Sequence, residues 1–172
     1  GSGMTQIHSF APIADAQATR LVLGSMPGKA SLAAGRYYAH PHNRFWPFME
    51  AVLGVPVRLP YEERCAELRR RGVAVWDVLK TCTRTSSLDS DIVEASIVPN
   101  DFAEFLLLHP HIQAIYFNGA KAETVFTRHV LPTLGDMQAR IPRIRLPSTS
   151  PANASIPLQT KLSMWQQLGS GN

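Results

Sequence analysis

Three loop segments of the sequence concentrate residues that could bind a phosphate or a nucleobase, and the first is Gly24-Ser25-Met26-Pro27-Gly28. Two glycines and a proline favour a tight turn with exposed backbone N–H groups. Such groups can hold a phosphate or hydrogen-bond the edge of a base. The segment lacks the Gly-Lys-Ser/Thr ending of a P-loop, so it does not predict a nucleoside triphosphate site. An ordinary strand-to-loop turn has the same composition, and both interpretations stay open at this point.

The second segment, Tyr37-Tyr38-Ala39-His40-Pro41-His42-Asn43-Arg44-Phe45-Trp46, is dense in aromatic, histidine and amide side chains. A tyrosine ring in a loop can stack on a flipped or single-stranded base. The Asn43 amide could hold a water or read a base edge, although asparagine is also common at helix N-caps. His40 and His42 suggest a metal pair, but no third ligand clusters with them, so we predict no metal.

The third segment is Leu146-Pro147-Ser148-Thr149-Ser150-Pro151-Ala152-Asn153, which is rigid and rich in hydroxyl groups. Small hydroxyl residues donate to phosphate oxygens without adding bulk, and a simple Ser/Pro turn is the alternative interpretation. Asp89 and Asp91 could form a carboxylate pair elsewhere in the chain. No other residue at a recognisable spacing completes a site with them, so we interpret them as solvated loop carboxylates.

Short apolar runs alternate with stretches of helical spacing, and these elements must position the three segments. We predict strands at residues 20–24, 73–76, 114–117 and 143–146, and helices at residues 45–53, 61–71, 120–131 and 157–168. A further helix is expected from an N-cap at Asn100 to Leu108, and residues 80–91 are expected to form a loop. The last helix carries one apolar stripe, formed by Leu158, Leu162, Trp165 and Leu168.

Four strands separated by helices predict an α/β fold with a parallel sheet covered on both faces. In such a sheet, ligands bind beyond the carboxyl ends of the strands. The loops that leave these ends lie at residues 25–43, 77–91, 118–119 and 148–153. We therefore expect these four loops to build the functional site.

Length and composition limit the class of protein. The chain has 172 residues, with 45% hydrophobic and 17% charged residues, which predicts one packed domain over residues 4–172. Gly1-Ser2-Gly3 before Met4 is interpreted as an expression-tag remnant. A net charge of +4 carried mostly by arginine permits an anionic partner such as nucleic acid. No apolar run approaches the ~20 residues of a membrane span, and no signal peptide is expected. Two cysteines, Cys65 and Cys82, suit reduced thiols in the cytoplasm.

Taken together, the three segments resemble the uracil-DNA glycosylase superfamily, and most closely its hypoxanthine-DNA (deoxyinosine) glycosylase branch. The resemblance covers most of residues 19–168 and implies a three-layer α/β/α fold with a short, mainly parallel four-stranded sheet. Two positions depart from other branches. Met26 stands where mismatch-specific relatives have an asparagine that positions the attacking water, and Ser148 stands where uracil-specific relatives have a histidine. In the hypoxanthine branch the asparagine that maps onto Asn43 takes over the water.

The resemblance implies a monofunctional DNA glycosylase that flips out deaminated bases and hydrolyses the N-glycosidic bond, initiating base excision repair. It makes Asn43 the catalytic residue and Tyr38 the stacking residue, with the base edge read by Ser25, Met26, His40 and Asn118. It assigns DNA contacts to Gly28, Lys29, Arg44, Ser148, Thr149, Ser150, Ala152 and Asn153. It implies no cofactor, and we expect a cytoplasmic monomer, nucleoid-associated if the source is bacterial, whose partner is DNA that contains deaminated bases.

Three alternatives remain open at the level of sequence. A mismatch-specific uracil-DNA glycosylase on the same fold would release uracil rather than hypoxanthine. A catalytically weak binder of damaged or single-stranded DNA would show no turnover, which fits the missing asparagine at Met26. A nucleoside hydrolase would act on free deoxyinosine.

Overall fold

The computed structural model describes residues 5–170, so the predicted tag remnant lies outside the described residues. The larger sheet has four strands in the order β3 (Val73–Asp77), β2 (Arg20–Gly24), β6 (Ala114–Asn118) and β7 (Arg143–Leu146). Each neighbouring pair is parallel, so the connections must cross the faces of the sheet. The predicted parallel four-stranded sheet is confirmed.

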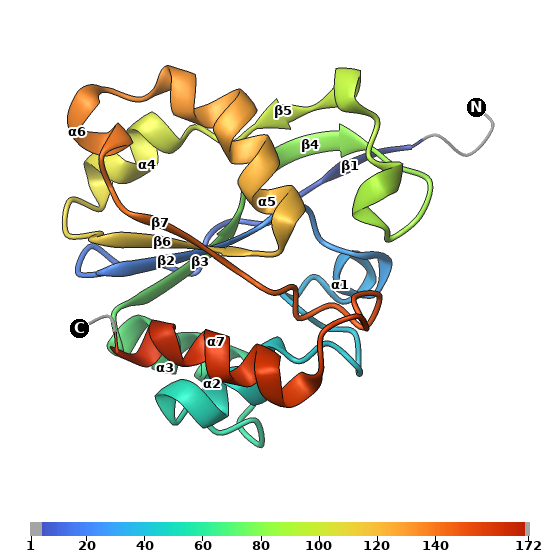
Figure 1. Ribbon diagram of the computed structural model, residues 1–172, viewed down its shortest axis with the longest axis vertical. Coiled ribbons are helices and arrows are strands. Elements are labelled where there is room, and N and C mark those ends of the chain that lie inside the picture. Colours follow the sequence, from blue (N-terminus) through green and yellow to red (C-terminus); the bar gives the residue numbers. More distant parts are fainter. Residues whose placement is uncertain (1–4, 171–172) are drawn as a thin grey trace.

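Helices cover both faces of this sheet, as Figure 1 shows. One face packs against α2 (Phe45–Leu53), α3 (Tyr61–Arg70) and α7 (Leu158–Ser170), and the other against α4 (Phe102–Leu108) and α5 (Ala120–Val125). Strand residues alternate between the two layers: Leu21 and Leu23 belong to the core with Phe102, and Val22 belongs to the core with Trp165. The fold is the three-layer α/β/α arrangement.

A second, smaller sheet was not predicted. It pairs β1 (Gln6–His8), β4 (Leu79–Thr83) and β5 (Val98–Pro99) in antiparallel order. The expected loop at residues 80–91 is therefore wrong over its first part, where Cys82 is fully buried while Lys80 is exposed. The partner strand β1 lies more than 70 residues away in sequence, so no local pattern marks β4. The rest of the stretch includes the 3₁₀ turn η1 (Asp89–Asp91).

Several helix boundaries also differ from the prediction. Asp101 rather than Asn100 caps α4, because its side chain accepts a hydrogen bond from the Glu104 N–H at 3.1 Å. The helix after β6 ends as α5 and continues as a π-helical turn (Phe126–Val130) and a 3₁₀ turn (Leu131–Thr133). Two short helices, α1 (Lys29–Ala34) and α6 (Asp136–Ala139), were not expected. The remaining 3₁₀ turn is η2 (Glu94–Ser96).

The inward stripe of α7 differs from the prediction in one position. Leu158 is 45% exposed, whereas Lys161 is 5% exposed and lies in the layer with Trp165 and Leu168. None of the helices in the described part of the chain is long and apolar enough to cross a membrane.

Candidate active site

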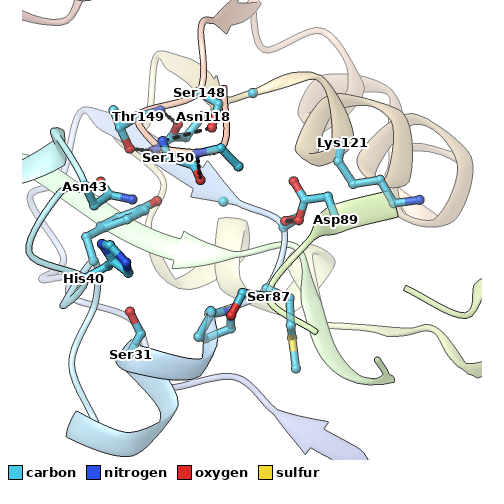
Figure 2. A pocket seen from close by; sticks show the side chains of 18 of the residues that line it. Ser31, His40, Asn43, Ser87, Asp89, Asn118, Lys121, Ser148, Thr149 and Ser150 are labelled. Atoms are coloured by element: carbon cyan, nitrogen blue, oxygen red, sulfur yellow. Dashed lines mark hydrogen bonds between the residues drawn. The ribbon is translucent and has the colours of Figure 1, made fainter. Parts of the chain in front are cut away.

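Four loops converge at the carboxyl ends of the parallel strands, next to α1 (Figure 1). They enclose a pocket of about 610 Å³, which is within the range of sites for small molecules (Figure 2). Its walls come from Asp77 at the end of β3 and from the loops after β2, β6 and β7 of the parallel sheet, together with the loop after β4 of the smaller sheet.

The floor of the pocket contains a carboxyl group that the sequence analysis did not single out. Asp77, the last residue of β3, is 3% exposed, and its Oδ2 is buried without a hydrogen-bond partner among the described residues. Burial and the neighbouring Asp89 raise the pKa of the Asp77 carboxyl to about 7, against the opposing charge of Arg84. The group therefore keeps its proton up to near-neutral pH.

Tyr38 shares this floor. Its hydroxyl is likewise buried without a partner among residues 5–170, and its ring stacks on Phe45 at 4.1 Å between centroids. Burial raises the pKa of the hydroxyl above its ordinary value, so it stays a donor. A Cβ atom on Gly24 would lie 2.6 Å from Asp77 Oδ1 and 3.0 Å from the Tyr38 hydroxyl oxygen, so only glycine fits between these two side chains. The stacking on Phe45 covers one face of the Tyr38 ring, which leaves at most the other face for the predicted contact with a base.

The second motif loop presents Asn43 and His40 on one side of the pocket (Figure 2). The Asn43 Oδ1 accepts a hydrogen bond from the Phe45 N–H at 2.9 Å, which starts α2. Its N–H₂ group makes no hydrogen bond with the rest of the described chain. The N-cap of α2 is therefore Arg44 rather than Asn43, which precedes it and accepts from the first N–H of the helix, and the N–H₂ group of Asn43 is left to the pocket. His40 is exposed, and its Nδ1 accepts from the His42 N–H at 3.1 Å.

The opposite side is formed by Asp89, which the sequence analysis interpreted as solvated (Figure 2). Its Oδ1 accepts a hydrogen bond of 2.6 Å from the Ser25 hydroxyl of the first motif. The residue as a whole is exposed, but its carboxyl is largely shielded from water by the surrounding protein. This burial raises the pKa of the carboxyl, whereas the Ser25 hydrogen bond and the positive charge of Arg84 lower it. Met26, the next residue of the motif, is 7% exposed and belongs to the apolar core.

The third motif loop is held by the side chain of Asn118. Its Nδ2 donates to Thr149 Oγ1 and its Oδ1 accepts from the Thr149 N–H, both at 2.9 Å. Thr149 is 1% exposed, so a side-chain contact of Thr149 with DNA would require breaking this pair. At Gly119, φ is +98° and a Cβ would lie 3.1 Å from the Ser148 Cβ, which requires glycine.

Two side chains of helix α7 hydrogen-bond to the backbone of the same loop. The buried ammonium of Lys161 donates to the carbonyl oxygens of Ser148, at 3.0 Å, and of Asn153. Trp165 Nε1 donates to the Pro147 carbonyl at 2.9 Å. These contacts tie three backbone carbonyls of the loop to α7.

The structure brings nearly all of the predicted site residues to this one pocket. Those that line it are Ser25, Met26, Gly28, Lys29, Tyr38, His40, Asn43, Asn118, Ser148, Thr149, Ser150, Ala152 and Asn153. Arg44 does not line it; its side chain is exposed and its N–H donates to the Thr149 carbonyl at 3.0 Å. Their roles remain predictions.

Three residues of the site escaped the sequence analysis or were misread by it. Asp77 carries a signal, since it directly follows a buried strand at the carboxyl end of the sheet. Lys161 shares a helical stripe with Trp165 and Leu168 but resembles a surface lysine. For Asp89 nothing local indicates its contact with Ser25, 64 residues away in sequence. Within the described residues, no group of three or more His, Cys, Asp or Glu side chains gathers in a geometry for a metal ion.

The chain is similar to one protein family, to two named proteins and to one solved structure. A family model described as the uracil DNA glycosylase superfamily matches residues 11–169. A protein named hypoxanthine DNA glycosylase from Methanosarcina barkeri is 32% identical over 116 residues, which cover 67% of this chain and 72% of the relative. Its namesake from Methanosarcina acetivorans is 33% identical over the same shares. The solution NMR structure of a candidate uracil DNA glycosylase from Methanosarcina acetivorans matches with a TM-score of 0.79 and 27% identity, covering 97% of this chain and 98% of the other.

Proposed function

The chain belongs to the uracil-DNA glycosylase superfamily, and on that premise we propose that it is a monofunctional glycosylase that releases hypoxanthine from DNA. The relatives named hypoxanthine DNA glycosylase support this choice of base. The reaction hydrolyses the N-glycosidic bond of a flipped deoxyinosine and leaves an abasic site. Because deoxyinosine pairs imperfectly, flipping it costs less than flipping a normal nucleotide.

The pocket floor is the observation that carries the proposal. Asp77 lines the pocket, and its carboxyl when neutral offers one O–H donor and one acceptor. Hypoxanthine presents the complementary pair at its far edge, an N1–H donor beside the O6 acceptor. Uracil presents the same pair at N3–H and O4, which makes it the second candidate base. Hydrogen bonds to the oxo group would also strengthen as the base departs with negative charge.

Cleavage through an oxocarbenium-like transition state needs little nucleophilic force, so the main task is to place a water. Asn43 is our candidate for this task. Its N–H₂ group, which bonds to no other described residue, would contact the water or the nucleotide as a hydrogen-bond donor. We expect no lysine nucleophile and hence no enzyme–DNA adduct after borohydride treatment.

The rim of the pocket suits the phosphates on either side of the flipped nucleotide. Gly28 and the serines of the third motif line the pocket. The exposed Lys29 follows Gly28 in sequence, and the exposed Arg44 lies beside the third motif, where its N–H donates to the Thr149 carbonyl. Such contacts fix the register of a protein on DNA without reading its sequence. Ala152 is exposed and lines the pocket, and we expect it to enter the gap left by the flipped base.

The test is a glycosylase assay on labelled oligonucleotides with one deoxyinosine or one deoxyuridine, single- and double-stranded, followed by alkaline cleavage. Asn43→Ala and Asn43→Asp are assayed in parallel. The aspartate variant keeps an oxygen for the Phe45 N–H but removes the amide donors, so it separates the structural from the chemical role.

Release of hypoxanthine, lost in both variants while the aspartate variant keeps its thermal stability, is the expected result. Release of uracil alone would shift the assignment to a uracil-DNA glycosylase. Binding of the deoxyinosine duplex without release of any base would mean that the protein is not an enzyme on these substrates.

A further inference from the structure

The hydrolysis leaves one requirement unmet by the groups considered so far, which is an acceptor for the proton of the attacking water. Asn43 cannot supply it, because a neutral amide is too weak a base to take a proton from water and its nitrogen only donates. Asp77 cannot supply it while its buried carboxyl is protonated. Met26 has no acceptor for this purpose and is packed in the core.

Asp89 places a carboxyl group in the wall of the pocket. It lines the same pocket as Asn43, on the opposite side (Figure 2). The 2.6 Å hydrogen bond from the Ser25 hydroxyl engages Oδ1 and fixes the side chain against the first motif. No hydrogen bond or ion pair within residues 5–170 engages Oδ2, so this oxygen is available to a water.

Building on the proposed function, we infer that Asp89 is a catalytic residue that orients the attacking water and accepts its proton. Met26, next to Ser25 in the first motif, has no group that could accept the proton. Asp89 is 64 residues from Ser25 in sequence, but its hydrogen bond with Ser25 brings a carboxylate to this motif. The donors of Asn43, on the other side of the pocket, then face the departing base or the water oxygen.

The proton and electron balance is complete without a co-reactant other than water. The C1′–N bond breaks and its electron pair leaves with the base, which takes up a proton from solvent. The water oxygen forms the new bond to C1′, and the proton it loses passes to Asp89 Oδ2 and then to solvent. A negative carboxylate near C1′ also stabilises the positive charge of the oxocarbenium-like transition state.

The groups around Asp89 decide its charge. Burial of the carboxyl is the largest influence on the pKa of Asp89 and raises it, while the Ser25 hydroxyl, the guanidinium of Arg84 and the ammonium of Lys121 act in the opposite direction and favour the carboxylate. The other acid that faces it, Asp77, is kept neutral by its own burial and therefore does not compete as an anion below about pH 7.

The test compares Asp89→Asn with Asp91→Asn, a matched change in the same 3₁₀ turn. Asp91 is exposed, accepts from the Ser86 hydroxyl and does not line the pocket. Single-turnover excision rates on a duplex with one deoxyinosine, or one deoxyuridine if that is the base released, are measured beside affinities for the same duplex. Ser25→Ala is added because it leaves the carboxylate in place but removes the hydrogen bond that fixes it.

We expect Asp89→Asn to slow excision by about 100-fold or more at unchanged affinity, in line with loss of a general base. Ser25→Ala should slow it by about tenfold as orientation is lost, and Asp91→Asn should stay within about twofold of the wild-type protein. A wild-type rate in Asp89→Asn, or a loss of affinity that accounts for its slower rate, would overturn the inference. If Asp89→Asn does not fold, a wild-type rate in Ser25→Ala has the same consequence. Absence of base release by the wild-type protein would instead refute the proposed function.

Discussion

Replacing the buried carboxyl of Asp77 by an amide should stabilise the protein at neutral and alkaline pH but not in acid. Asp77→Asn keeps the size and shape of the side chain and removes only its ionisation. In the folded protein, burial holds the pKa of the carboxyl at about 7, against an ordinary value of 3.8. The folded state therefore binds the proton more tightly than the unfolded state does, and stability falls as the pH rises between these two values.

The size of the effect follows from the difference in pKa. A rise from 3.8 to about 7, at about 1.4 kcal/mol for each unit of pKa, costs the wild-type protein about 4 kcal/mol of folding free energy above pH 7 relative to acid. This is a large share of the 5–15 kcal/mol that holds a typical domain together. Asp77→Asn should recover most of it above pH 7 and none of it near pH 4.

Urea denaturation at a series of pH values between 4.5 and 8 measures this directly. The quantity of interest is the difference in unfolding free energy between the two proteins, because ionisations shared by both cancel. Asp91→Asn, at an exposed carboxylate, is the control and should show no comparable trend. An amide imitates the donor and acceptor of a neutral acid, so Asp77→Asn should also keep base excision.

A constant difference between wild type and Asp77→Asn over this whole pH range would refute the reasoning, since it would mean that the carboxyl is ionised in the folded protein at every pH tested. A pH-dependent difference combined with complete loss of excision would leave the burial argument intact. It would then contradict the role of the neutral acid in holding the base.

Three further changes test the support of the site. Gly24→Ala places a methyl group 2.6 Å from Asp77 Oδ1, so it should cost about 1–3 kcal/mol of stability in urea denaturation and reduce excision; unchanged values for both would contradict the tight floor. Lys161→Met removes a buried ammonium from two loop carbonyls, so it should lower the free energy of unfolding by about 2 kcal/mol. It should also weaken affinity for a duplex with an abasic site. A wild-type melting temperature would show that the loop keeps its structure without this ammonium. Asn43→Ala should lower stability by about 1 kcal/mol through loss of the contact with the Phe45 N–H, and Asn43→Asp should not, as thermal melting would show.

Much of the scaffold could be predicted because it depends on neighbours in sequence. The four parallel strands and α2 appear at the predicted places, since continuous apolar runs and helical spacing are local signals. The order of strands and helices then placed the motif loops at one end of the sheet, where the pocket lies. The small antiparallel sheet was missed because β1 pairs with β4 across more than 70 residues and β5 is only two residues long.

The amino-acid sequence by itself determined which loops carry the chemistry, and it identified Asn43 with its two competing roles. Only the tertiary structure decided the state and orientation of the individual groups. Burial under Gly24 keeps a proton on Asp77, and the contact with Ser25 turns Asp89 from a loop carboxylate into a wall of the pocket. Burial and long-range contacts set the pKa and the direction of a side chain, and neither is encoded in the spacing of residues along the chain.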